Sequence, residues 1–574
     1  MKSLRLDKER GCCTSSLGKK EPSEITRKRD NTRFLLYNGL EMNRKQQEEY
    51  ISIRQGCQQL RFEICRKSEY KVEKDEFHRQ VSAQLEELDY RKLYSAYSGM
   101  IRKTQVEPRI LFEIIVCAYL KGEYSSRKIE ELCKENVQFI MLLDGQKAPD
   151  HCTIARFRSS EALSEAIADL FYQYAGVLER EGFTRHDEVF IDGTKIESKA
   201  NRYTFVWRKT VEKQLQKIRE KAKSMLGQEE GYLTKGKLKS GIEALNREIE
   251  EKELKTEKGR GHHKPKEIRK RDEEQTLLDR WESYEEKLKI LGEKRNSFSK
   301  TDPDATFMRM KDDHMRNGQL KPGYNVQFAV NSEFITGIGI YPNCTDYDTL
   351  PPLLEEMEKR HGKRYKRVVA DSGYESLKNY RVLASKGIEA YIKPNNYMSR
   401  RTRKYKAQIG RGENMAYYRP GDYYVCKNER ILSNIGTTRE KSADGTEKEV
   451  SRYRCEDCSE CPYRAQCCKA KDPQKQKELV ICREFDDFRQ ASYSRITTEE
   501  GKLLRINRSI QSEGAFGQLK HNRHLARFLT AGNVKVSNET YFAGLAQNIQ
   551  KYIAKCNSQR AKTHLLSPKS PEKS

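Results

Sequence analysis

Residues 187–198 read DEVFIDGTKIES, and residues 367–374 read RVVADSGY. In each stretch an apolar run leads into an aspartate, Asp192 or Asp371, and a glycine follows within two residues. Short apolar runs bounded by turn-forming residues are typical of buried strands. We therefore predict two buried strands, each ending at its aspartate. Ligands of open α/β sheets bind at the carboxyl ends of strands, so the two carboxylates are expected to lie close together.

Further strand-like runs surround these two stretches. GYNVQFAV occupies residues 323–330, FITGIGIYP residues 334–342 and IEAYIKP residues 388–394, while LPPLLEEMEKRHG at 350–362 has the pattern of a helix. Strands and helices that alternate in this order predict a mixed α/β core.

The charge of the chain indicates its class of partner. Lys and Arg number 111 against 85 Asp and Glu, a formal net charge of +26, and residues 501–574 alone hold 13 Lys and Arg, 3 Glu and no Asp. Such an excess favours a polyanion, most simply nucleic acid. A merely basic soluble protein is the alternative.

The sequence offers no signal for a membrane or for secretion. No apolar run approaches the roughly 20 residues of a membrane span, and the first residues lack the apolar stretch of a secretory signal. We expect a cytoplasmic protein, whose sixteen cysteines serve as thiols or metal ligands rather than disulfides.

Composition and periodicity divide the chain into expected parts. Residues 205–300 are charged and helix-forming, with apolar positions three and four apart, which predicts a helical or coiled-coil insertion. The other expected parts are a flexible basic and polar extension with short helices (1–77), a helical DNA-binding domain (78–180), the catalytic core (181–204, 301–397 and 491–556), a Cys-rich insertion (398–490) and a disordered tail (557–574).

The paired aspartates point to a cation. Two carboxylates held close together need a cation or a shared proton, and hard oxygen ligands favour Mg²⁺ or Mn²⁺. Taken singly, Asp192 and Asp371 are each compatible with an ordinary turn-capping role. The pair indicates a metal site only if a third carboxylate ligand joins it.

Residues 507–528, NRSIQSEGAFGQLKHNRHLARF, supply that carboxylate. In a regular helix Glu513, Phe516, Gly517 and Lys520 would share one face. We predict that Glu513 completes the metal site and that Lys520 meets a phosphate. A solvated charged helix is the alternative, but it leaves the helix-weakening glycines without a reason.

A cysteine cluster lies between the second aspartate and this segment. Residues 454–470 read RCEDCSECPYRAQCCKA, a C-x₂-C-x₂-C-x₅-C spacing that suits tetrahedral Zn²⁺. Iron–sulfur ligation uses similar runs, and unligated thiols are the third interpretation. The candidate zinc ligands are Cys455, Cys458, Cys461 and Cys467, with Cys468 as the alternative to Cys467 and Cys426 and Cys482 as flanking contributors.

Several of these blocks together resemble a family. IDGTKIES, PGYNVQ, VVADSGY and RSIQSEGAFGQLK resemble the catalytic blocks of bacterial insertion-sequence transposases of the DDE type, in particular the group related to insertion sequence eleven-eighty-two. PDHCTIARFR, at residues 149–158, resembles the end of the helical N-terminal domain of those proteins. The resemblance extends from about residue 85 to residue 555.

The resemblance implies a fold and a site. It implies a ribonuclease-H-like mixed sheet with flanking helices, and Asp192, Asp371 and Glu513 as the acidic triad. The family's signature lysine, seven residues after the glutamate, corresponds to Lys520. Its arginine, four residues before the glutamate, is replaced by Ser509, with Arg508 adjacent. The residues expected to bind DNA are Lys520, Arg508, Arg523, Arg156 and Arg158.

The function implied is cleavage and strand transfer of an insertion sequence, bound at its terminal inverted repeats. Two Mg²⁺ or Mn²⁺ ions about 4 Å apart would activate a water and then a DNA 3′-hydroxyl for in-line attack. The expected partners are double-stranded DNA and a second copy of the chain in a dimer, associated with the bacterial nucleoid. The alternatives are an inactive, transposase-derived DNA-binding protein and a ribonuclease-H-like nuclease without strand transfer.

Overall fold

The computed structural model describes residues 59–64, 66–71, 77–99, 106–226, 235–254, 264–310, 318–442, 444–470, 472 and 474–567. The chain divides into two compact units, residues 1–76 and residues 77–574. In the first unit, strands β1 (Gln59–Ile64) and β2 (Arg66–Lys71) pair antiparallel. The predicted short helices are therefore wrong for this stretch, and the rest of the predicted flexible extension lies outside the described residues.

The second unit begins with helices. Helix α4 (Pro108–Leu120) is buried on nearly every side, because its sequence PRILFEIIVCAYL is apolar all round. Its Phe112 ring lies 5.2 Å from that of Phe542 in α19 (Asn533–Asn557), so this helical layer and the C-terminal helix share one core. The other helices of the layer are α2 (Phe77–Glu86), α3 (Arg91–Ser98), α5 (Ser126–Glu135), α6 (Val137–Leu142), α7 (His151–Arg158) and α8 (Ser164–Arg180).

A mixed sheet forms the centre of the second unit. Its strand order is β10-β9-β3-β7-β6, and β8 also pairs with β7. Strands β3, β7 and β8 pair antiparallel, while β9 and β10 run parallel to β3. This is the arrangement of a ribonuclease-H-like sheet, and the predicted α/β fold class is confirmed. The strands are β3 (Glu188–Glu197), β6 (Thr306–Arg309), β7 (Leu320–Asn331), β8 (Phe334–Tyr341), β9 (Arg367–Ala370) and β10 (Glu389–Ile392).

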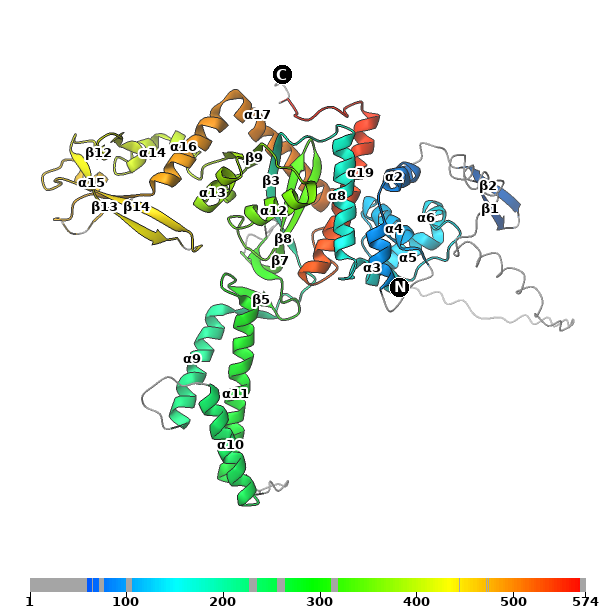
Figure 1. Cartoon of the computed structure of the whole chain (residues 1–574), viewed down its shortest axis with the longest axis horizontal. Helices are drawn as coiled ribbons and strands as arrows, with labels where there is room; N and C mark the ends of the chain where they lie inside the picture. The colour runs from blue at the N-terminus through cyan, green and yellow to red at the C-terminus, as the bar shows by residue number, and fades with distance from the viewer. Residues whose placement is uncertain are drawn as a thin grey trace, which may run out of the picture. The chain divides into compact units, whose positions relative to one another are not determined.

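Helices cover both faces of this sheet (Figure 1). On one face α12 (Leu350–His361) and α13 (Leu377–Ser385) enclose a core that includes Val189 and Ile191 of β3. On the other face α8 and α19 pack against the alternate residues of the same strand, such as Phe190. Because β3 is buried on both faces, its apolar run is continuous rather than alternating.

A three-helix hairpin separates β3 from the rest of the sheet in sequence. Helices α9 (Arg208–Met225), α10 (Lys235–Glu251) and α11 (Lys266–Leu291) lie side by side in Figure 1. Leu215, Leu238 and Trp281 belong to their shared apolar core. At its base, β4 (Phe205–Trp207) pairs antiparallel with β5 (Ser297–Ser299).

Residues 398–482 form a second sheet with five antiparallel strands in the order β11-β12-β13-β14-β15. Arg483, at the start of α16, lies 3.8 Å from the ring centroid of Tyr417 and donates hydrogen bonds to the hydroxyls of Tyr424 and Tyr453. The elements are η2 (Ser399–Arg401), α14 (Arg403–Lys406), η3 (Gly412–Asn414), β11 (Ala416–Tyr418), β12 (Tyr423–Val425), β13 (Ile431–Lys441), β14 (Glu447–Cys455), α15 (Arg464–Cys467) and β15 (Glu478–Ile481).

The chain then returns to the central sheet through α16 (Arg483–Thr497) and α17 (Glu499–Arg508). The helix continues through two π-helical turns, η4 (Ser509–Glu513) and η5 (Gln518–Asn522), on either side of α18 (Gly514–Gly517). No helix among the described residues is long and apolar enough to cross a bilayer.

Part of the predicted disordered tail is ordered instead. Asn507 Oδ1 accepts a hydrogen bond from the backbone N–H of Leu566 at 2.7 Å, and Gln511 Nε2 donates to the carbonyl of His564 at 3.0 Å. Lys555 Nζ donates to the carbonyl of Thr563 at 2.8 Å. These contacts hold residues 563–566 against α17, η4 and α19, a result that the polar composition of the tail did not reveal.

Candidate active site

Asp192 and Asp371 lie side by side on neighbouring parallel strands. Ile191 of β3 pairs with Ala370 of β9, so the next residue on each strand is an aspartate. Asp371 follows the end of β9 as predicted, and its carboxylate accepts a hydrogen bond from the Gly373 N–H at 2.8 Å.

The predicted end of the first strand is wrong. Strand β3 continues past Asp192 to Glu197, because β7 pairs with it over the whole stretch from Phe190 to Glu197. Asp192 therefore lies in the middle of a strand, and its side chain is only 9% exposed. Its neighbour β9 ends at Ala370, so the parallel pairing still places both carboxylates at the same edge.

Arg508, the last residue of α17, connects two of the predicted ligands. Its Nη1 lies 3.4 Å from Asp192 Oδ2, and its Nη2 lies 3.5 Å from Glu513 Oε1. The arginine side chain is only 16% exposed. It therefore supplies a positive charge between two carboxylates at the position next to Ser509, where the family places its arginine.

Glu513 ends the first π-helical turn and remains accessible. Its side chain is 64% exposed, and Ser509 Oγ donates a hydrogen bond to its Oε1 at 2.7 Å. The turn is held on the sheet by Phe516, whose ring stacks on Phe328 of β7 with centroids 4.6 Å apart and planes 9° apart. Phe328 pairs with Asp192 across the β3–β7 ladder, so this stack places Glu513 on the same side of the sheet as Asp192.

The prediction for a regular helix puts Glu513 and Lys520 on one face, but in the structure Glu513 is exposed and Lys520 is buried. The π turns at Ser509–Glu513 and Gln518–Asn522 change the regular helical spacing on which it rested. Lys520 is buried, and its Nζ donates to the carbonyl of Lys195 on β3 at 2.9 Å. This hydrogen bond ties the second π turn to the strand that carries Asp192.

The arginines predicted to bind DNA differ in their accessibility. Arg158 is buried and donates hydrogen bonds to the Tyr124 carbonyl and to Ser126 Oγ. Arg523 is also buried, and its Nη2 donates to Gln550 Oε1. Both guanidinium groups therefore have internal partners, whereas Arg156 at the end of α7 is exposed.

A fourth acid, Asp346, belongs to the same edge and was missed by the sequence analysis. Its Oδ1 accepts hydrogen bonds from Asn325 Nδ2 at 2.7 Å and from Gln327 Nε2 at 2.8 Å. A Cβ added to Gly373 would lie 3.0 Å from Asp371 Oδ1 and 3.2 Å from Asp346 Oδ2. The signal available in the sequence was the polar stretch TDYDT, which begins at residue 345, shortly after the predicted strand at 334–342.

Tyr374 is connected to Asp346 through Gln327. Its hydroxyl donates to Gln327 Oε1, and Gln327 in turn donates to Asp346. Burial raises the pKa of Tyr374 well above its usual value, and the negative charges of Asp346, Asp192 and Asp371 raise it further. The tyrosine therefore remains a neutral donor beneath the site.

Asp346→Ala is expected to lower the rate of DNA cleavage by about 10- to 100-fold, the size of effect that follows the loss of a group supporting a metal site from outside its ligands. The substitution leaves the amides of Asn325 and Gln327 without their acceptor and loosens the support of Tyr374. Asp348→Ala is the matched control, since Asp348 lies in the same loop as Asp346. Its carboxylate pairs instead with Lys294 and Lys378. Equal losses of cleavage rate in Asp346→Ala and Asp348→Ala would show that Asp346 has no specific role in supporting the site.

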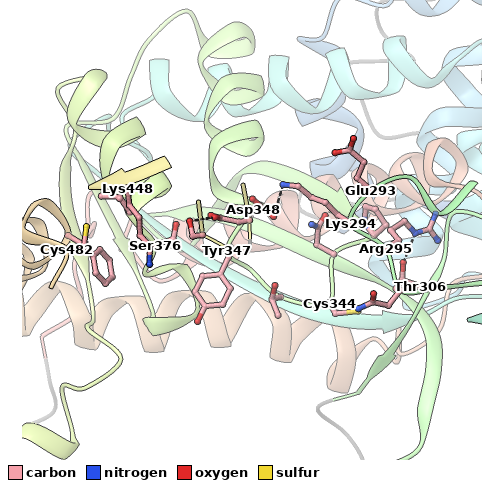
Figure 2. Close-up of a pocket in the computed structure, with 18 residues that line it drawn as sticks. Glu293, Lys294, Arg295, Thr306, Cys344, Tyr347, Asp348, Ser376, Lys448 and Cys482 are labelled. Atoms are coloured by element: carbon pink, nitrogen blue, oxygen red, sulfur yellow. Dashed lines mark hydrogen bonds and ion pairs between the residues drawn. The ribbon is translucent and has the colours of Figure 1, made fainter. Parts of the chain in front are cut away.

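A cavity with a volume of about 690 Å³ lies beside the loop that carries Asp348. Figure 2 shows Lys294 and Asp348 joined by an ion pair, with Tyr347 and Lys448 also lining the space. Its walls come from the base of the three-helix hairpin, the β8–α12 loop, the start of α13 and the second sheet. Cys482 lines this cavity, apart from the other cysteines of its region.

The donor set suits a hard divalent cation. Asp192, Asp371 and Glu513 offer carboxylate oxygens, the ligands that Mg²⁺ and Mn²⁺ prefer. Within the described part of the chain, no three His, Cys, Asp or Glu side chains are arranged so that they could hold a metal ion. At the acidic site the Arg508 guanidinium is ion-paired with both Asp192 and Glu513.

Comparison with known proteins identifies two domains of the chain. A family described as "Transposase DDE domain" matches residues 425–553, and a family described as "Transposase domain (DUF772)" matches residues 66–160. Searches of curated proteins and of solved structures gave no match. DDE transposases bind DNA and use divalent metal ions. Both matched families are transposase domains, and together with the ribonuclease-H-like sheet they indicate a DDE transposase of an insertion sequence.

Proposed function

We propose that this chain cleaves the ends of an insertion sequence and joins them to target DNA, after binding the terminal inverted repeats. The observation that carries the proposal is the pairing of Ile191 with Ala370, which sets Asp192 beside Asp371 at one edge of the sheet. Glu513 faces the same edge through Arg508. We also propose that the chain is related to the narrower group of insertion sequence eleven-eighty-two.

Asp192, Asp371 and Glu513 are proposed to hold two Mg²⁺ or Mn²⁺ ions. Bound there, the ions would activate the attacking oxygen and stabilise the charge that develops on the leaving oxygen. Asp192 and Asp371 come from paired strands and are held in place, whereas Glu513 is exposed at the end of a π turn. Glu513 is therefore the ligand that changes rotamer to complete the site.

Arg508 has two roles in this proposal. Without metal, its guanidinium offsets the charges of Asp192 and Glu513 and so reduces their repulsion. When cations take over that neutralisation, Arg508 can turn toward a DNA phosphate. Its Nη1 is ion-paired with Asp192 Oδ2 at 3.4 Å but makes no hydrogen bond to the described residues, so this nitrogen is the donor that would move to the phosphate.

The DNA itself is proposed to be bound through exposed basic residues. Arg156 at the end of α7 is one of them. Neutralising phosphates releases counterions from the duplex, so affinity for terminal-repeat DNA should fall steeply as salt rises. The active form is proposed to be a dimer, which a mass measurement of the protein–DNA complex would test.

The function is tested by incubating purified protein with the DNA that flanks its own coding sequence and with a target plasmid. We expect Mg²⁺-dependent cleavage at inverted repeats and covalent joining of the cleaved ends to the plasmid. Cleavage without joined products would favour a nuclease. Binding without cleavage, in Mg²⁺ and in Mn²⁺, would favour an inactive DNA-binding derivative.

A further inference from the structure

Six cysteines gather around one small cavity at the end of the second sheet. They come from three separate parts of the chain: the turn between β12 and β13, the end of β14 with the loop after it, and the end of α15. The cavity has a volume of about 20 Å³. The cysteines that line it are Cys426, Cys455, Cys458, Cys461, Cys467 and Cys468.

Hydrogen bonds distinguish two of these thiols from the rest. Cys455 Sγ donates to the Asp457 carbonyl at 3.3 Å, and Cys468 Sγ donates to the Lys475 carbonyl at 3.8 Å. Both sulfurs thus already have backbone partners as neutral thiols. Cys458 Sγ instead accepts a hydrogen bond from the backbone N–H of Lys477 at 3.4 Å, which is the direction that suits a thiolate.

The remaining thiols surround Cys467. The groups that influence its sulfur most include Lys477 and the thiols of Cys426, Cys458 and Cys461, while the Cys455 sulfur lies close to Cys458 and Cys426. Cys426 is some thirty residues away from the C-x₂-C motif in sequence, so only the pairing of β12, β13 and β14 brings it here. Cys482, the other flanking candidate, lines the larger cavity instead.

We propose that Cys426, Cys458, Cys461 and Cys467 bind one structural Zn²⁺ ion. This assignment keeps the predicted Cys458, Cys461 and Cys467, and replaces Cys455 by Cys426. Two of the ligands, Cys458 and Cys461, have the two-residue separation of a zinc knuckle. Four thiolates match the tetrahedral preference of zinc.

A bound metal ion would stabilise the second sheet locally. The apolar core of this sheet is small, with Tyr424, Leu432, Tyr453 and Leu479 as its non-cysteine members. Small cores usually need a disulfide or a metal to hold their loops. The loop from β14 to β15 packs closely: a Cβ on Gly410 would lie only 2.4 Å from the Cys467 carbonyl oxygen. A bound ion would tie this loop to the β12–β13 turn.

The thiols still have to close around the ion. No three of them are yet arranged so that they could hold a metal in the described residues. A change of χ1 rotamer moves a cysteine sulfur by about 3 Å, enough to convert neighbouring thiols into a shell with Zn–S distances of about 2.3 Å. Cys461 and Cys467 are partly exposed, so such rotations need no repacking of the core.

The test is the metal content of the full-length protein, purified without chelator from zinc-containing medium. We expect about one zinc per chain in the wild type and less than about 0.1 in Cys461→Ser and Cys426→Ser, since a tetrahedral structural site needs all four ligands. Cys468→Ser and Cys482→Ser are the matched controls and should retain the metal. Cobalt-substituted wild-type protein should show the charge-transfer and visible bands of a four-thiolate tetrahedral site.

Several results would overturn the proposal. These are wild-type protein with only trace zinc, iron with acid-labile sulfide in place of zinc, and full zinc content in Cys426→Ser. Loss of zinc in Cys468→Ser with retention in Cys461→Ser would refute the ligand assignment. The cobalt spectrum is recorded on the wild type, so it is independent of whether the serine variants fold. The outcome does not depend on DNA cleavage, which tests the proposed function separately.

Discussion

Asp192→Asn is expected to lower the rate of DNA cleavage by about 10³-fold or more, because losing a metal ligand removes several kcal/mol of transition-state stabilisation. The asparagine has nearly the same shape, so strand β3 and its pairing with β7 and β9 should persist. The variant keeps one oxygen but loses the charge that balances a cation. Binding of terminal-repeat DNA, measured by gel shift without metal, should remain.

Asp187→Asn is the control for this experiment. Asp187 directly precedes β3 and pairs with Lys366 at 2.7 Å, but it is more exposed and lies at the opposite end of the strand from the site. Its cleavage rate should stay within about threefold of the wild type, as is usual for a surface ion pair. An Asp192→Asn protein that cleaves within tenfold of the wild type would remove Asp192 from the proposed site.

Phe516→Ala is expected to destabilise the second unit by about 3 to 5 kcal/mol, the usual cost of truncating a buried phenylalanine. The ring is buried and stacks on Phe328, so its loss leaves a cavity between the helix and the sheet. The same stack positions Glu513, so cleavage should fall as well, even at temperatures where the protein remains folded. Chemical denaturation and cleavage assays on the same preparation measure both effects.

Ile510→Ala provides the comparison. Ile510 lies in the same π turn but is 43% exposed, so its truncation should cost under about 0.5 kcal/mol. Phe516→Leu retains most of the apolar contact and should recover much of the stability. If Phe516→Ala were as stable as Ile510→Ala, the stack would not be what anchors the glutamate segment.

Much of the central fold could be predicted from local patterns. The apolar runs before Asp192 and Asp371 predicted two buried strands, and the structure places those strands next to each other. The end of β3 could not be predicted, since residues after Asp192 are extended only because β7, over a hundred positions later, pairs with them. Such long-range pairing leaves no periodic signal in the strand itself.

The surroundings of Glu513 depended on tertiary structure even more. A regular helix would place Glu513 and Lys520 on one face, but two π turns separate an exposed carboxylate from a buried lysine. The sequence also did not show that Arg508, next to Ser509, forms ion pairs with both Asp192 and Glu513. The spacing of residues in the sequence does not show where a π turn interrupts a regular helix.

The sequence by itself determined the fold class, the two aspartates and the transposase family, because strand-forming runs, charge and motif blocks are local properties of the chain. Tertiary structure decided which polar groups meet. It added Asp346 beneath the aspartate pair and gave Arg158 and Arg523 internal partners. It also brought Cys426, rather than Cys482, to the cysteine cavity. Those contacts join residues distant in sequence, and they exist only once sheet pairing and helix packing have brought the segments together.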